Sequence, residues 1–328
     1  YKEIQGFPIQ NLSSDPVPFA QEKINNPYAR TWSSGGNLNT AKSDAASDGT
    51  QTAAIFTGGE PGSLTQTELY DGSSWTEVAD LNTGRAALGA AGTTTAAVAF
   101  GGKTPGADEN ALNESWNGSA WTEVADLNTA RRMLAGYGTN TAALSTGGNS
   151  GSITAVNESW NGTAWTEVGD LNTARQQLSG FGTQTSSIVS PGSNPGSTPP
   201  VIANVESWNG SAWTEIAELN TSRRQTGAAG TDNTSGLFFG GETNPPTVYR
   251  AQTEDWDGST WTEINDLSTA RADAEGAGTS TAALASGGLT PPHTAATEEL
   301  AFTGIPPTAP AAGYSDAIVG QMYYNSTT

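Results

Sequence analysis

The sequence of 328 residues contains no cysteine and a single histidine, His293. The absence of cysteine excludes a disulfide-bonded scaffold and thiolate metal sites. One histidine leaves little room for histidine-based catalysis or a histidine-rich metal site, and no EF-hand loop for calcium occurs. We therefore expect no metal, no other cofactor and no catalytic residue.

Basic residues are also scarce, because 13 Lys and Arg stand against 33 Asp and Glu, for a formal charge of −20. Such a field repels phosphate backbones, so neither nucleic acid nor an anionic membrane is an expected partner. No run approaches the roughly 18 apolar residues that a membrane span needs. The first residues also lack the basic and then apolar regions of a signal peptide.

What the sequence does contain is one phrase repeated at a nearly constant period. Its copies run from Trp75 to Arg85, Trp121 to Arg131, Trp165 to Arg175, Trp213 to Arg223 and Trp261 to Arg271. A degenerate copy runs from Trp32 to Lys42. A period of this length indicates a solenoid or the blades of a propeller.

Each repeat has the pattern of four short strands. An Asx-Gly pair stands between the last two strand segments, as in Asn161-Gly162. Such a pair predicts a hairpin with a type I′ turn, in which both central residues have φ > 0. The same pair is found at Asp71-Gly72, Asn117-Gly118, Asn209-Gly210 and Asp257-Gly258.

The ends of the repeat region favour a closed ring. The last repeat supplies three strands, through 296–302, and its missing fourth strand is the orphan segment around 31–38. An open array would leave both ends as unpaired edges, which are prone to aggregate. We therefore predict an all-β, six-bladed β-propeller, with four antiparallel strands per blade and the last blade closed by an N-terminal strand. The propeller should span 29–304, with an extended arm at 1–28 and a Pro-rich, strand-like tail at 305–328.

Two charged positions recur once in every repeat, which points to a structural role. One is the arginine that ends each phrase (Arg85, Arg131, Arg175, Arg223, Arg271, with Lys42 in the first copy). The other is a third-strand glutamate (Glu68, Glu114, Glu158, Glu206, Glu254, and Glu298 or Glu299). We expect these residues to form an ion pair from blade to blade, since one substrate cannot use six equivalent sites. The six repeated tryptophans that open the fourth strands are expected to anchor the blades.

The loops between the second and third strands vary while the strands repeat. A rigid scaffold with variable loops on one face is a common basis for binding sites. The candidate ligand-binding residues in these loops are Tyr249, Arg250, Asn244, Lys103 and Asp108. Tyr249 and Arg250 are the strongest pair, because they could stack on a sugar ring and hydrogen-bond to it. Neutral drift in a tolerant loop is the alternative.

Several of these features resemble the kelch-type β-propeller, over about residues 30–304. They are the Asx-Gly turn, the tryptophan that opens the fourth strand, and the paired glycines at the end of the second strand. The paired glycines are Gly58-Gly59, Gly101-Gly102, Gly147-Gly148, Gly240-Gly241 and Gly287-Gly288.

A narrower resemblance is to kelch-like repeat proteins of marine bacteriophage virions, such as tail-fibre or other appendage proteins. It rests on the Trp-Thr-Glu-Val-Ala-Asp-Leu-Asn-Thr-Ala-Arg phrase and on the flanking segments 9–16 and 320–328. It implies a multi-copy virion protein, attached by its terminal arms to other virion proteins, that binds a host-surface glycan or protein and is not an enzyme. The alternatives are a secreted carbohydrate-active enzyme or inactive relative, and an assembly-only subunit. An enzyme would need an asymmetric cluster of acids, or a metal, at one end of the central channel.

Overall fold

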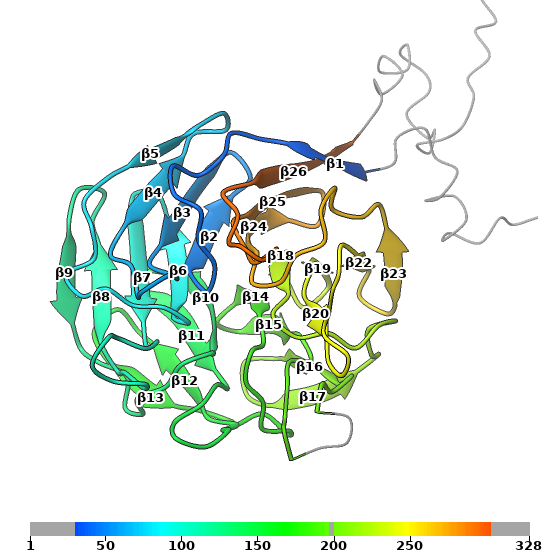
Figure 1. The fold of residues 1–328 in the computed structure, drawn as a ribbon. Coiled ribbons are helices and arrows are strands. Elements are labelled where there is room, and N and C mark those ends of the chain that lie inside the picture. Colours follow the sequence, from blue (N-terminus) through cyan, green and yellow to red (C-terminus); the bar gives the residue numbers. More distant parts are fainter. Residues whose placement is uncertain (1–29, 197–199, 303–328) are drawn as a thin grey trace, which may run out of the picture. The chain divides into compact units, whose positions relative to one another are not determined.

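The computed structural model describes residues 30–302 except 197–199, and in these residues the regular elements are all β-strands. The predicted arms at 1–28 and 305–328 lie outside the described residues. Six four-stranded antiparallel sheets, the blades, are arranged around a common centre (Figure 1). The fold is therefore the six-bladed β-propeller that the repeats predicted.

Blades one to three follow the chain in order. Blade one contains β2 (Ala46–Thr50), β3 (Ala53–Thr57), β4 (Thr67–Tyr70) and β5 (Trp75–Glu77). Blade two contains β6 (Gly89–Thr93), β7 (Ala96–Phe100), β8 (Asn113–Trp116) and β9 (Trp121–Val124). Blade three contains β10 (Ala135–Thr139), β11 (Ala142–Thr146), β12 (Asn157–Trp160) and β13 (Trp165–Glu167).

Blades four and five continue the series. Blade four contains β14 (Gly180–Thr183), β15 (Ser186–Val189), β16 (Val205–Trp208) and β17 (Trp213–Ile216). Blade five contains β18 (Gly227–Asp232), β19 (Ser235–Phe239), β22 (Thr253–Trp256) and β23 (Trp261–Ile264). Its variable loop forms a small extra hairpin, β20 (Glu242–Thr243) with β21 (Val248–Tyr249).

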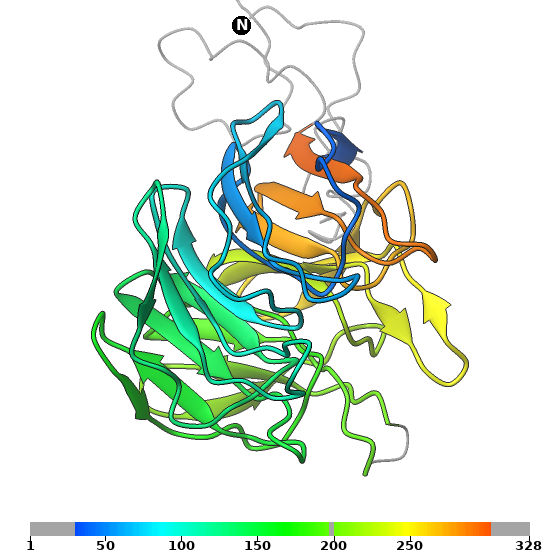
Figure 2. The same ribbon diagram turned by 60° about the vertical axis from the view of Figure 1, so that its left-hand side comes forward.

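Blade six closes the ring as predicted. It contains β24 (Glu275–Thr279), β25 (Ala282–Ser286) and β26 (Thr297–Phe302), and its outer strand is β1 (Arg30–Ser34). Both views show β1, in dark blue, beside the orange β26 (Figures 1 and 2). Arg30 of β1 also forms a buried ion pair with Asp255 of blade five, at 2.8 Å. The closing strand is thus fastened to two blades.

The innermost strands pack side by side around the channel, from β2 through β6, β10, β14, β18 and β24 and back to β2. The small residues of these strands allow a close approach. A Cβ atom on Gly276 of β24 would lie 1.9 Å from the carbonyl oxygen of Ala228 in β18. The small-residue segment that follows each repeated arginine is therefore a packing requirement.

The repeated tryptophans join neighbouring blades. Trp165, which opens β13, lies with its ring centroid 4.7 Å from that of Phe100 in blade two. Trp121 donates its indole N–H to Thr67 of blade one at 3.0 Å, and Trp32 donates to Thr253 of blade five at 2.9 Å. Burial of one such ring contributes up to roughly 4–6 kcal/mol. These side chains close the core between each pair of sheets.

The Asx-Gly hairpins form, but the expected type I′ turn is wrong. Four residues separate β8 from β9, and only Gly118 among them has positive φ, at +92°. The Asn117 side-chain oxygen instead accepts the backbone N–H groups of Ser119 and Ala120, both at 2.9 Å. The Asx residue is selected for this side-chain cap, so it does not need a left-handed backbone.

Candidate functional site

Antiparallel connectivity places two kinds of connection at one edge of every blade. These are the variable loops between second and third strands, and the segments that lead from each outer strand to the next blade. We call this edge the loop face. The turns between first and second and between third and fourth strands lie at the opposite edge.

Six residues surround the central channel at the loop face, and we call them the channel mouth. Each lies two positions after the repeated arginine or lysine, and each has φ between +50° and +57°. They are Asp44, Ala87, Met133, Gln177, Gln225 and Asp273. Non-glycine residues rarely adopt this conformation and it costs about 1 kcal/mol or more. Its presence in all six blades shows that something in the ring holds it in place.

A series of backbone hydrogen bonds between neighbouring blades stabilises that conformation. The backbone N–H of Ala87 donates to the carbonyl oxygen of Asp44 at 2.7 Å, and Met133 donates to Ala87 at 2.8 Å. Gln177, Gln225 and Asp273 each donate in the same way to the mouth residue of the preceding blade at 2.9 Å. Because these bonds use only the backbone, the side chain at each mouth position is free to differ.

Those side chains do differ, and the acidic ones cluster. Asp44 and Asp273 belong to adjacent blades, and Glu275 lies near them at the start of β24. All three line a cavity of about 90 Å³ at the mouth, together with Gln177 and Gln225. The cluster is asymmetric, because blades three and four, which lie opposite the two aspartates, present Met133 and Gln177 at the mouth.

Burial raises the pKa of all three carboxyl groups. The pKa of Glu275 rises to about 8, through burial and then the charge of Asp44. Burial raises the pKa of Asp273, and Asp44 and Glu275 raise it further. For Asp44, burial raises the pKa while the ammonium group of Lys103 opposes the rise. Glu275 therefore keeps its proton at neutral pH.

Polar side chains from several blades surround the acids. Gln225 donates its amide N–H to Asp273 at 2.6 Å. Ser43 Oγ and His293 Nδ1 lie 3.0 Å apart beside Asp44. A second layer consists of the residue after each arginine, which bridges to the first residue of the variable loop, as in Ser43 with Glu60. This layer also lacks periodicity, since its six residues are Ser43, Ala86, Arg132, Gln176, Arg224 and Ala272.

A smaller cavity of about 50 Å³ lies deeper in the channel. Its acidic residue is Asp48, whose carboxylate accepts the backbone N–H groups of Gly49 and of Gly92 in the next blade, both at 2.7 Å. Burial raises the pKa of Asp48 to about 7 despite these bonds. Asp48 therefore couples two inner strands and also titrates near neutrality.

Two of the loop candidates interact electrostatically with acids of the channel mouth, although neither lines its cavity. Lys103 pairs with Glu60 at 2.6 Å and acts on the pKa of Asp44. Tyr249 pairs across the β20–β21 hairpin with Glu242, and burial, Glu242 and Asp273 together raise its pKa.

The other three candidates have more peripheral contacts. Arg250 contacts Thr243 at 3.4 Å through Nη2. Asp108 is 78% exposed and lies 3.7 Å from Arg132 of blade three. Asn244 lies in the connection between β20 and β21, partly exposed. None of the five loop candidates lines the cavity at the mouth, and Tyr249 and Lys103 are the two whose charge environment includes its acids.

The mouth residues themselves were absent from the sequence-based candidates. The signal that could have found them is the position two residues after each arginine. It carries Asp, Ala, Met, Gln, Gln and Asp directly after a phrase that is otherwise nearly constant from repeat to repeat.

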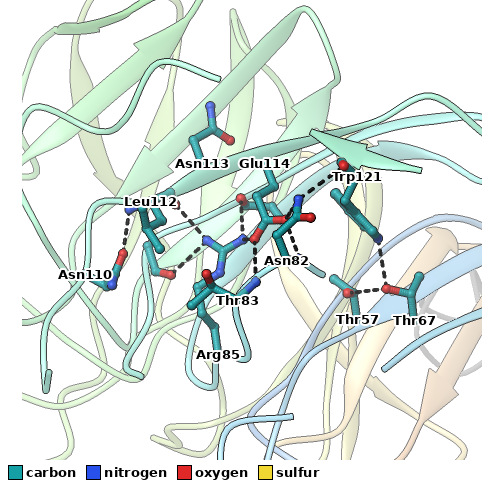
Figure 3. A network of polar contacts seen from close by, with 12 residues as sticks. Thr57, Thr67, Asn82, Thr83, Arg85, Asn110, Leu112, Asn113, Glu114 and Trp121 are labelled. Carbon is teal, nitrogen blue, oxygen red and sulfur yellow. Dashed lines mark hydrogen bonds and ion pairs between the residues drawn. The ribbon is translucent and has the colours of Figure 1, made fainter. Parts of the chain in front are cut away.

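The repeated charged residues form a buried structural network (Figure 3). In blade two, Arg85 pairs with Glu114 at 3.0 Å and donates to the carbonyl oxygens of Ala99, Gly101 and Leu112. The equivalent pairs are Lys42–Glu68, Arg131–Glu158, Arg175–Glu206, Arg223–Glu254 and Arg271–Glu298.

The expectation of an ion pair from blade to blade is wrong, because both partners belong to the same blade. Arg85 precedes β6 and Glu114 lies on β8. The link between blades comes from the same glutamate by another route. Glu114 accepts the backbone and side-chain N–H groups of Asn82, both at 2.8 Å, in the segment that arrives from blade one. In blade six Glu298 has the equivalent role, while Glu299 accepts the hydroxyl of Tyr70.

Within residues 30–196 and 200–302, no group of three or more His, Asp or Glu side chains is arranged to hold a metal ion. No helix of the described chain could cross a membrane.

Comparison with known proteins supports the fold alone. No protein family and no curated protein sequence matches this chain. Among solved structures, one titled "Structure of YjhT" is similar with a TM-score of 0.64 and 16% sequence identity, over 82% of this chain and 97% of that one. At this identity the likeness carries fold and not function. The chain is a six-bladed β-propeller with a propeller structural neighbour.

Proposed function

We propose that this protein is a binding module displayed on a virion appendage, and that its loop face binds a polar ligand of a host surface, either a glycan or a protein. The virion assignment rests on the resemblance of the repeated phrase and of the flanking segments to phage appendage proteins. The kelch type belongs to the same proposal. The terminal arms would attach several copies to other virion proteins, and no catalysis is required.

The observation that carries the proposal is the contrast between a periodic scaffold and an aperiodic loop face. The buried pairs and tryptophans repeat in every blade, whereas Asp44, Asp273, Lys103, Arg132 and Arg224 have no such repetition. A structural role would favour repetition, since each blade makes the same packing contacts. Side chains that break the repeat at one end of a rigid ring favour recognition of a ligand.

The edge of the ring at which the chain enters and leaves is consistent with display of the loop face on a particle. The chain enters the ring at Arg30 and leaves it at Phe302, and these strand ends occupy the place of the Asx-Gly turn in blade six. They therefore lie at the edge opposite the loop face. A module attached at that edge leaves the channel mouth available to a ligand.

The test is binding of the full chain to a glycan array and to host cells. Tyr249→Ala and Gln225→Ala should each weaken binding about tenfold, equivalent to about 1.4 kcal/mol. The matched control is Thr139→Ala in the exposed turn of the opposite edge, which should bind like the parent chain. Loss of binding only in the control, or binding insensitive to both loop-face changes, would contradict the proposal. Binding to virion proteins alone would favour an assembly-only subunit.

A second candidate function, a carbohydrate-active enzyme, is favoured by one specific observation. Glu275 is protonated at neutral pH, and two further carboxyl groups with raised pKa lie close to it in the same cavity. Glycoside hydrolysis needs a carboxylic acid that donates a proton and a second carboxylate. Turnover of a glycan by the full chain, abolished by Glu275→Gln, would replace the binding proposal with this one.

A further inference from the structure

Within the part of the chain that the structure describes, the outer strand of each blade is the free edge of its sheet. In blades one to five this edge carries two exposed carboxylates at fixed positions, two and five residues after the tryptophan. They are Glu77 and Asp80, Glu123 and Asp126, Glu167 and Asp170, Glu215 and Glu218, and Glu263 and Asp266. Charged side chains on an edge strand prevent it from pairing with another chain.

Blade six lacks this protection. Ser34 and Asn37 of its outer segment occupy the two acidic positions, and both are exposed. The one charged residue of β1, Arg30, is 9% exposed and is neutralised by Asp255. The nearest carboxylate of the blade is Glu299 on the neighbouring strand, which is partly buried and bound by Tyr70. The edge of β1 is therefore uncharged.

The charge of the molecule makes this edge distinctive. Two chains of formal charge −20 repel each other at long range. Where two acidic edges meet, like charges would also lie directly opposite each other, which destabilises a strand pair. At β1 the long-range repulsion between the two chains remains, but no like charges would lie directly opposite each other. Of the six outer edges, β1 is the one that another copy can approach without burying carboxylates.

We infer that β1 is a self-association surface, at which β1 of a second copy pairs antiparallel across a two-fold axis. The same five residues then serve both partners, as an isologous contact requires. The unpaired N–H and C=O groups of each edge find partners in the other, and the two blades become one eight-stranded sheet. A contact between strands this short is small, so the dimer is weak and forms at high local concentration.

The test is sedimentation velocity of the full chain from about 1 μM to about 1 mM, the range in which small interfaces dissociate. We expect a monomer–dimer equilibrium. The variant Ser34→Glu with Asn37→Asp restores the acidic pair and should remain monomeric throughout. The matched control, Thr139→Glu with Thr141→Asp, adds the same charge to an exposed turn and should dimerise like the parent. Because the changed residues are exposed, circular dichroism should show all three chains folded.

A reciprocal variant tests whether loss of the acidic pair is sufficient to make an outer edge self-associate. Glu263→Ser with Asp266→Asn removes the acidic pair from blade five and should produce species larger than a dimer. The inference is overturned if the parent chain stays monomeric, or if the Ser34 and Asn37 variant dimerises equally. A monomer whose β1 amides are nonetheless protected from hydrogen exchange, with protection lost in that variant, would show that a flanking segment of the same chain covers the edge. That outcome also overturns pairing with a second copy.

Discussion

Replacement of Glu114 by alanine should destabilise the propeller far more than the loss of one surface charge. The carboxylate is buried and accepts hydrogen bonds from Asn82, Thr83 and Arg85 at 2.8–3.4 Å. Its removal leaves the fully buried guanidinium of Arg85 without its counter-ion. Breaking a buried pair in this way costs about 3–5 kcal/mol. We expect a loss of that size in the free energy of unfolding.

The assay is urea unfolding followed by tryptophan fluorescence, with Glu123→Ala as the control. Glu123 is exposed on the next strand of the same blade, so its loss should cost no more than about 0.5 kcal/mol. The double change Arg85→Met with Glu114→Leu removes both charges and should cost less than the sum of its two single changes. A loss below about 1 kcal/mol for Glu114→Ala, or additive costs in the double variant, would refute the reasoning.

Three further predictions concern the rest of the ring. The free energy of unfolding should fall from pH 5 to pH 8. The reason is that the folded chain retains protons on Glu275 (pKa about 8) and Asp48 (pKa about 7) that the unfolded chain has already released. In thermal melts, Glu275→Gln should flatten this pH profile. Lys42→Arg should raise the melting temperature, by adding about 1 kcal/mol of hydrogen bonds to blade one that the Lys42 ammonium does not make. Arg30→Ala should cost about 2 kcal/mol by removing the charge-assisted hydrogen bond that Arg30 donates to Asp255, and hydrogen exchange should then accelerate first in β1.

The architecture could be predicted because its determinants repeat. Trp32 and Lys42 match the phrase well enough to identify an orphan fourth strand, and the last repeat lacks that strand. Both facts are visible without coordinates, and edge pairing converts them into a ring. The buried Arg–Glu pairing was equally readable, since two charged positions recur at constant separation. Its assignment between blades failed because the sequence does not show which segment each side chain turns toward.

The channel mouth could not be predicted for a related reason. The left-handed backbone at Met133 and Gln177 is imposed by hydrogen bonds from the neighbouring blade, and these residue types give no local signal for it. Variation at that position resembles drift in a surface loop until the ring brings the six residues together. The raised pKa of Glu275 likewise depends on burial among residues distant in sequence.

The backbone hydrogen bonds at the channel mouth separate the choice of side chains around the opening from the contacts that keep the ring folded. Each blade contributes one interchangeable residue to the opening, and the bonds that seat it are indifferent to its identity. Recombination between the near-identical repeats would shuffle blades, and with them the order of side chains around the opening, while every tryptophan and buried ion pair stayed in register. Exchange of whole repeats would therefore change the side chains around the opening while the contacts that hold the ring together are kept.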